Sequence, residues 1–74
     1  MNRIVTNQKI LGGKPIIKGT RLSVEFILNL LASGAPEQEI LADYPHIIVE
    51  DIHACLQYAA NSLKNDIYIE WECV

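Results

Sequence analysis

The sequence predicts a mainly α-helical fold with a short N-terminal β-hairpin arm and an extended C-terminal tail. Apolar residues recur at helical spacing in three segments between residues 23 and 64, whereas β-prone residues flank a glycine before residue 22. After residue 65, apolar and polar residues alternate as in a strand. At 74 residues the chain is expected to form one domain (1–74), consisting of an arm (1–22), a three-helix bundle (23–64) and a tail (65–74).

The arm is expected to fold as a tight hairpin. Ile16-Ile17 and Thr20-Arg21-Leu22 are β-prone, and they flank Lys18-Gly19, where glycine tolerates the positive φ of a tight turn. Pro15 cannot donate to a ladder, so its strand is expected to begin there or to lie on an edge.

Local signals define the ends of the first two helices. Ser23 is a good N-cap for the first helix, and Gly34 is a typical residue just beyond a helix end. The buried stripe of this helix is predicted to contain Val24, Ile27, Leu28 and Leu31. The second helix is expected to start at Pro36 and to stop before Pro45, since the residue before a proline is disfavoured in the α conformation.

The third helix is predicted to run from about Val49 to Lys64. Its buried stripe is expected to comprise Ile52, Cys55, Leu56, Ala59 and Leu63. The opposite face carries polar residues at spacings of three and four, namely Glu50, His53, Gln57, Asn61 and Lys64.

The charge of the chain is distributed unevenly. The net charge is −3, but the segment before residue 22 carries +5 and the remainder carries −8. A basic arm on an acidic body can attract phosphate or another acidic surface. The alternative is that the arm packs on its own acidic body or on that of a partner. The overall acidity argues against strong nonspecific DNA binding, because Lys and Arg supply that affinity.

Composition indicates a cytoplasmic protein that is expected to form a homodimer. Half of the residues are hydrophobic, more than one small core needs, which suggests that apolar surface is buried against a second copy or a partner. The N-terminal residues lack the apolar stretch of a signal peptide, and no run approaches a membrane span. Cys55 and Cys73 are therefore expected to be reduced thiols.

Residues 13–24 carry a recognisable motif. This stretch, GKPIIKGTRLSV, closely resembles the GKPxIKGTRxxV signature of the domain of unknown function catalogued as number 433. The similarity continues through LLASG (30–34), ILADYP (40–45), EDI (50–52) and YAA (58–60). The resemblance implies a homeodomain-like fold with a helix-turn-helix and a VapB-type antitoxin function. It also implies a PIN-like ribonuclease toxin as partner, operator DNA as ligand, and autoregulation as a dimer.

The sequence departs from the family pattern at three places. Ala35 precedes the helix-starting proline, where members often have Ser or Asp, and Ile48 and Val49 stand where Thr or Ser usually precedes the third helix. Each lost cap costs about 1 kcal/mol. His53 lies near a position where members often carry Arg, which weakens contact with phosphate or bases at neutral pH.

Two sets of residues are candidates for DNA contact. A helix-turn-helix places its second helix in the major groove, so the third helix would present His53, Gln57, Asn61 and Lys64. The arm would offer Lys14, Lys18, Thr20 and Arg21 to phosphate. The alternatives are an ordinary solvated helix face and an arm whose residues have structural roles, with Arg21 paired to a carboxylate of the body.

In terms of the resemblance, the tail would engage the toxin. Trp71 is the expected anchor, since a large aromatic residue in a pocket often dominates an interface. The contact set comprises Ile67, Ile69, Glu70, Trp71 and Glu72. The alternative is that the tail pairs as a strand with Ile4-Val5 of its own or a sister chain.

No enzyme, metal or cofactor is predicted. His53 and Cys55 are two residues apart and so lie on different helix faces, and His46 and His53 lack the spacing of a zinc site. The main alternative to an antitoxin is a protein-binding or dimerisation module without DNA affinity.

Overall fold

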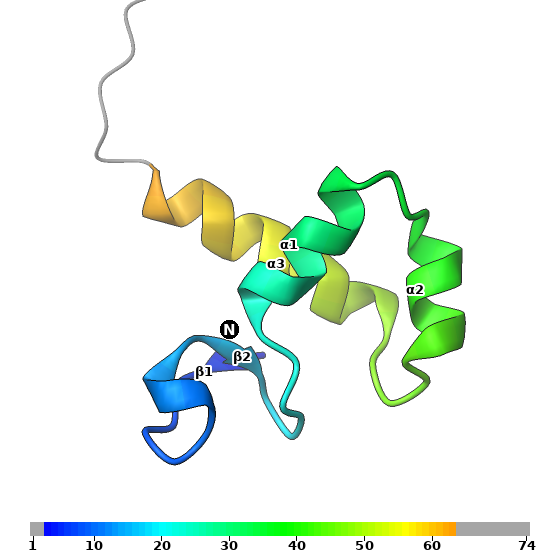
Figure 1. Cartoon of the computed structure of the whole chain (residues 1–74). Helices are drawn as coiled ribbons and strands as arrows, with labels where there is room; N and C mark the ends of the chain where they lie inside the picture. Colours follow the sequence, from blue (N-terminus) through cyan, green and yellow to red (C-terminus); the bar gives the residue numbers. More distant parts are fainter. Residues whose placement is uncertain (1–2, 64–74) are drawn as a thin grey trace, which may run out of the picture.

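The computed structural model describes residues 3–63, which form three helices and a small antiparallel sheet. The elements in chain order (Figure 1) are β1 (Ile4–Val5), a 3-10 turn (Leu11–Gly13), β2 (Ile16–Ile17), α1 (Val24–Ala32), α2 (Glu37–Asp43) and α3 (Val49–Ser62). The predicted order of an N-terminal β arm followed by three helices is confirmed. None of the helices in this range is long and apolar enough to cross a membrane.

Both ends of α1 are formed as the local sequence predicts. The Ser23 hydroxyl accepts a hydrogen bond from the Phe26 N–H at 2.9 Å, which caps the first turn. At the other end Gly34 adopts φ +99°, and its N–H donates to the Leu31 carbonyl at 3.0 Å. The Ala35 N–H then donates to the Leu30 carbonyl, completing a Schellman motif that ends the helix.

The second helix begins one residue later than expected. Pro36 is the N-cap, with an extended backbone, and is not the first helical residue. The helix ends at Asp43, immediately before the Tyr44-Pro45 pair, as predicted.

The third helix begins at Val49 although its N-cap, Ile48, has no side chain that can accept a hydrogen bond. Asp51 compensates from within the first turn, because its Oδ2 accepts from the Ile48 N–H at 3.0 Å. The helix ends at Ser62. Lys64, the expected last residue, lies outside the described residues.

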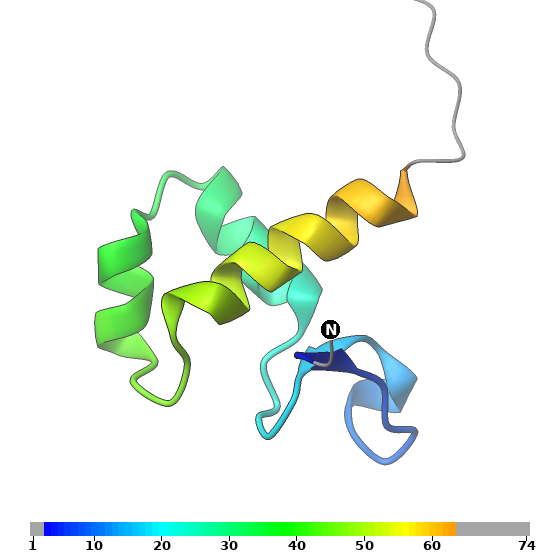
Figure 2. The same cartoon turned by 180° about the vertical axis from the view of Figure 1, so that it is seen from behind.

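The core lies where the three helices and β2 meet. Its buried members are Ile17, Val24, Ile27, Ile40, Ile47, Ile52 and Cys55. The predicted stripe of α3 is correct for Ile52 and Cys55 but wrong for Leu56 and Leu63, whose exposures are 44% and 52%. Figures 1 and 2 give the reason, since α3 runs past the point where α1 crosses it and its distal half is covered on one side only.

The arm differs from the predicted hairpin. The strand partner of β2 is β1, with Ile4 opposite Ile17 and Val5 opposite Ile16. On its other side β2 makes one isolated bridge, between Ile16 and Ser23, and residues 18–21 form a four-residue loop in place of a tight two-residue turn. The Ile17 N–H also donates to the Leu22 carbonyl at 2.9 Å, so residues 22–23 run back along β2 after this loop without forming a regular strand.

Candidate functional site

One face of α3 carries exposed polar side chains, which we call the polar strip: His53, Gln57 and Asn61. The Gln57 Nε2 donates to the Asn61 Oδ1 at 3.0 Å. A side-chain amide has two N–H donors and a carbonyl, so Gln57 keeps one donor and its acceptor for an external ligand such as an adenine edge. His53 differs, because its Nε2 lies 3.3 Å from Glu37 Oε2 on α2, and this contact directs the ring toward an acid.

The polar strip lies beside β1. Ile4 lines a shallow hollow together with Ala54, Gln57, Tyr58 and Asn61 of α3. A ligand that follows α3 would therefore also meet the first strand. Of the residues predicted for this face, Lys64 lies outside the described range.

The cations of the arm fall into two groups. Lys14 Nζ lies 3.2 Å from Glu25 Oε1, and Arg3 lies 3.1 Å from Asp51 Oδ1. In contrast, Lys9, Lys18 and Arg21 are exposed and have no ion-pair partner within residues 3–63. Both partners of the Lys14–Glu25 pair are largely exposed, so it contributes little stability and is readily exchanged for another anion. The alternative in which Arg21 pairs with a carboxylate of the body finds no such ion pair within residues 3–63.

Thr20 holds the loop together. Its hydroxyl donates to the Ile17 carbonyl at 2.7 Å and accepts from the Leu22 N–H at 3.0 Å. The single hydroxyl proton is thus used inside the loop, which favours the structural role over phosphate contact. Thr20 orients the Lys18–Arg21 loop, and the two cations are its exposed charges.

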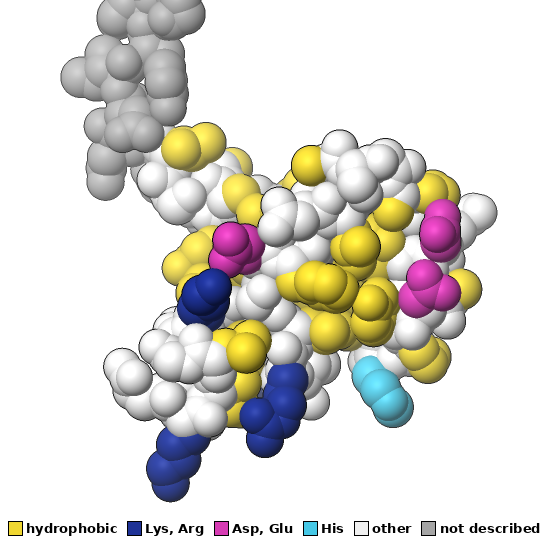
Figure 3. All heavy atoms as spheres, in the orientation of Figure 1, with side chains coloured by type: hydrophobic (Ala, Val, Ile, Leu, Met, Phe, Trp, Pro, Cys, Tyr) yellow, Lys and Arg dark blue, Asp and Glu magenta, His cyan; other side chains and the backbone are white. Residues whose placement is uncertain are grey.

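The arm cations and the polar strip occupy different hollows of the surface. Arg21 lines a groove of about 740 Å³ between the arm and the C-terminal end of α2, where it meets Tyr44 and His46. The Lys and Arg side chains visible in Figure 3 lie over the arm, whereas the acidic ones lie over the helices. Arg21 and the polar strip thus line different hollows of the described surface.

The groove is a feature that the sequence does not reveal. Its apolar lining comes from separated segments, namely Val5, Ile10, Ile16, Leu22, Tyr44 and Pro45. The Tyr44 ring packs edge-on against Phe26, with the ring centroids 5.7 Å apart. Local patterns cannot place segments that are twenty or more residues apart against each other.

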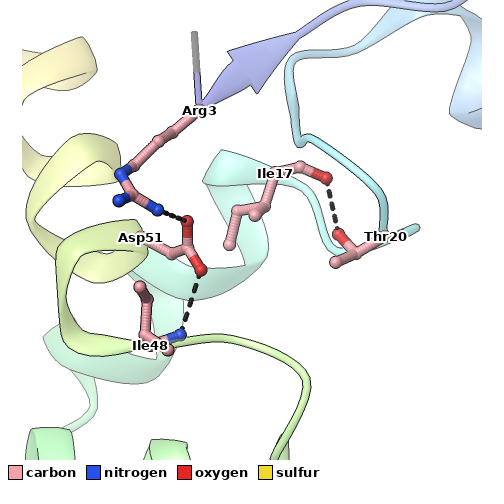
Figure 4. A network of polar contacts seen from close by, with 5 residues as sticks. All are labelled: Arg3, Ile17, Thr20, Ile48 and Asp51. Carbon is pink, nitrogen blue, oxygen red and sulfur yellow. Dashed lines mark hydrogen bonds and ion pairs between the residues drawn. The ribbon is translucent and has the colours of Figure 1, made fainter. Parts of the chain in front are cut away.

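Asp51 is the second feature that sequence reasoning missed. Its side chain is buried and joins the arm to α3 (Figure 4). One carboxylate oxygen contacts the Arg3 guanidinium and the other accepts from the Ile48 N–H. An acid three residues after the N-cap is the signal that indicates such capping.

The described thiol is inert. Cys55 is fully buried, and burial, with a smaller effect of the nearby Asp51 carboxylate, raises its pKa from 9.0 to about 11. A thiol that stays protonated at neutral pH is a poor nucleophile and a poor metal ligand. Between Arg3 and Leu63, no group of three or more His, Cys, Asp or Glu side chains is arranged to hold a metal ion.

The predicted partner contacts Ile67, Ile69, Glu70, Trp71 and Glu72 lie outside the described residues, as does Cys73. The alternative partner for the tail, Ile4–Val5, is paired with β2 along one edge.

Comparison with known proteins places the chain in a family. The profile of the family described as "Protein of unknown function (DUF433)" matches residues 4–59. A crystal structure of a DUF433 member protein from Anabaena variabilis ATCC 29413 is similar, with a TM-score of 0.78 and 33% sequence identity. The similarity covers 82% of this chain and 60% of that chain. No curated protein matches the sequence. With its three helices, its two-stranded arm and a profile match over most of its length, this chain belongs to the DUF433 family.

Proposed function

We propose that the protein is the antitoxin of a type II toxin–antitoxin pair. In this role it neutralises a PIN-like ribonuclease and binds its own operator DNA as a dimer. The motif at residues 13–24, which resembles the signature of the DUF433 family, supports the proposal, because this resemblance implies a VapB-type antitoxin. So does the separation of a basic arm from an acidic helical body.

The operator-binding part of the proposal treats α2 and α3 as a helix-turn-helix with α3 as the recognition helix. The observation that carries it is the exposure of Gln57 and Asn61, whose side chains within residues 3–63 are hydrogen-bonded only to each other. Amide side chains at this spacing suit base edges in the major groove. Lys18 and Arg21 then supply phosphate contacts from the arm, because no carboxylate in the described part of the chain neutralises them.

The salt dependence of binding to the protein's own promoter fragment tests this part. Three to five phosphate contacts give a log–log slope of about −3 to −5. A variant with Lys18→Gln and Arg21→Gln is expected to reduce the steepness by about 2 per bound copy. The matched control, Lys18→Arg with Arg21→Lys, keeps both charges and retains the slope. No retention of the fragment at low salt, or equal slopes for all three proteins, would contradict operator binding.

The neutralisation part assigns toxin contact to the tail, with Trp71 as anchor and Glu70 and Glu72 facing basic groups that hold RNA. A chain truncated after Asn65 keeps α1, α2 and α3 and is expected to lose protection against the ribonuclease. The control is Trp71→Phe, which keeps an aromatic anchor and is expected to protect. Full protection by the truncated chain would exclude the tail as the contact.

A second candidate function is a protein-binding module without DNA affinity. The observations that favour it are the ion pair of Arg3 with the buried Asp51, which leaves one cation fewer for phosphate, and the apolar groove beside Tyr44. The two functions are distinguished by the promoter-fragment experiment, because this module would show no salt-dependent retention at any ionic strength.

A further inference from the structure

Within residues 3–63, no other segment covers one apolar face of the distal half of α3. Leu56, Ala60 and Leu63 follow one another at spacings of four and three residues, so they form a single line along the helix, which we call the leucine stripe. Leu56 and Leu63 are among the six large apolar side chains that are exposed in residues 3–63. Isolated exposed leucines are common, but a continuous apolar line on a projecting helix is typical of an interaction surface.

The charge around the stripe indicates what covers it. Residues 54–63 contain no Asp, Glu, Lys or Arg, although the whole chain carries −3. A second copy of an acidic chain is repelled wherever charged surfaces meet, and an uncharged face removes that penalty. A basic partner, in contrast, would gain more from the acidic side chains of α2, namely Glu37, Glu39 and Asp43, than from this segment.

We propose that two copies of the protein associate through the leucine stripe, with the distal halves of their α3 helices packed against each other. A two-fold interface uses the same patch on both copies, so Leu56 of one copy meets the stripe of the other. The small side chains of Ala59 and Ala60 lie between the two leucines and allow the helices to approach closely.

The geometry of the helix keeps the stripe compatible with the polar strip. Successive residues are about 100° apart around an α-helix, so the line through Leu56, Ala60 and Leu63 and the line through Gln57 and Asn61 occupy adjacent sectors. Association through the first line leaves the second exposed on both copies. The leucine stripe would be the interface of the dimer in the proposed function. Association through it requires neither DNA binding nor ribonuclease binding.

Sedimentation of the full chain over a concentration series, without DNA or toxin, tests the inference. The wild type is expected to shift reversibly from monomer to dimer, because a stripe of two turns per copy is smaller than a standard interface. Leu56→Glu and Leu63→Glu are each expected to weaken association at least about tenfold through lost apolar contact and like-charge repulsion across the axis. Leu11→Glu is the matched control, since Leu11 is 51% exposed, against 52% for Leu63, but lies on the arm.

Far-UV circular dichroism establishes that each variant is folded, and Leu56→Gln provides a neutral substitute if an added charge disturbs the helix. Dimers of the wild type and of Leu11→Glu, with monomers of both stripe variants, support the inference. A wild-type monomer up to about 1 mM overturns it. A stripe variant that associates like the wild type also overturns the inference. Equal dissociation of all three Glu variants overturns it as well, because the added charge rather than the stripe would then be responsible.

Discussion

Asp51 is expected to be the most stabilising charged residue of the described structure, and Asp51→Ala tests this. The substitution removes the acceptor for the Ile48 N–H and the partner of Arg3. A lost cap costs about 1 kcal/mol. The ion pair contributes about 0.5–1 kcal/mol, because the Arg3 side chain is 41% exposed and solvent screens it. Ile48 is itself half exposed, so water replaces the lost acceptor and limits the cost.

Together with the helix dipole, these contributions predict a loss of about 2 kcal/mol in the free energy of unfolding. A domain of this size has a total of roughly 4–11 kcal/mol, so the melting temperature is expected to fall by about 10 °C. Urea unfolding followed by circular dichroism measures the change. Glu50→Ala is the matched control, since it removes an adjacent first-turn acid that makes no described contact, and it is expected to cost no more than about 0.5 kcal/mol. Equal losses for the two variants would refute the assigned role of Asp51.

Three further predictions concern stability and thiol chemistry. Ile52→Ala is expected to lower the free energy of unfolding by about 2–4 kcal/mol because Ile52 is fully buried. Leu56→Ala on the same helix should lower it by less than about 1 kcal/mol in dilute solution, since Leu56 is exposed. The reverse order in urea unfolding would contradict the described core. Gly34→Ala is expected to lower the free energy of unfolding by about 1 kcal/mol from backbone strain alone, since φ is +99° and an added Cβ meets nothing within 4 Å. Gly34→Asn should lower it by less, because Asn adopts a positive φ more readily. Equal unfolding free energies for Gly34→Ala and the wild type would argue against the C-terminal cap. Because the pKa of Cys55 rises from 9.0 to about 11 on folding, the unfolded chain releases its proton first, so stability should fall by up to about 1.4 kcal/mol per pH unit between these values. Cys55→Ala should lack this part of the pH dependence, and in a Cys73→Ser background rapid reaction of the folded protein with a thiol reagent would contradict the burial of Cys55.

Helix boundaries were predictable because their signals are local. Ser23 caps through an atom three residues away, Gly34 supplies a positive φ, and Pro45 excludes the α conformation from its neighbour. Each effect depends on a single turn of chain. The expected exposure of His53, Gln57 and Asn61 followed from helical periodicity in the same way and is confirmed.

The predictions that were wrong concern contacts between segments that are distant in the sequence. Periodicity identifies Leu56 and Leu63 as part of an apolar line but contains no information on where α1 stops covering it. The partner of β2 lies twelve residues upstream, and a two-residue strand is too short to specify its pairing. The cap expected to be missing at Ile48 is supplied by Asp51, whose second role toward Arg3 spans 48 positions of the chain.

The same distinction applies to the candidate site. Sequence alone groups Lys14, Lys18, Thr20 and Arg21 as one basic cluster. The structure separates them, since Lys14 contacts Glu25 and the Thr20 hydroxyl is used within its loop. Of the three cations in this cluster, only Lys18 and Arg21 have no ion-pair partner within residues 3–63, and Lys14 would have to exchange Glu25 for a phosphate.

The central claim is that this chain inhibits a ribonuclease, and a titration of activity tests it most directly. The PIN-like nuclease expected beside its gene would be assayed on RNA while the full chain is added in increasing amounts. The proposal predicts a stoichiometric loss of cleavage that reaches completion near equivalence. Undiminished cleavage at a large excess of folded protein would contradict it.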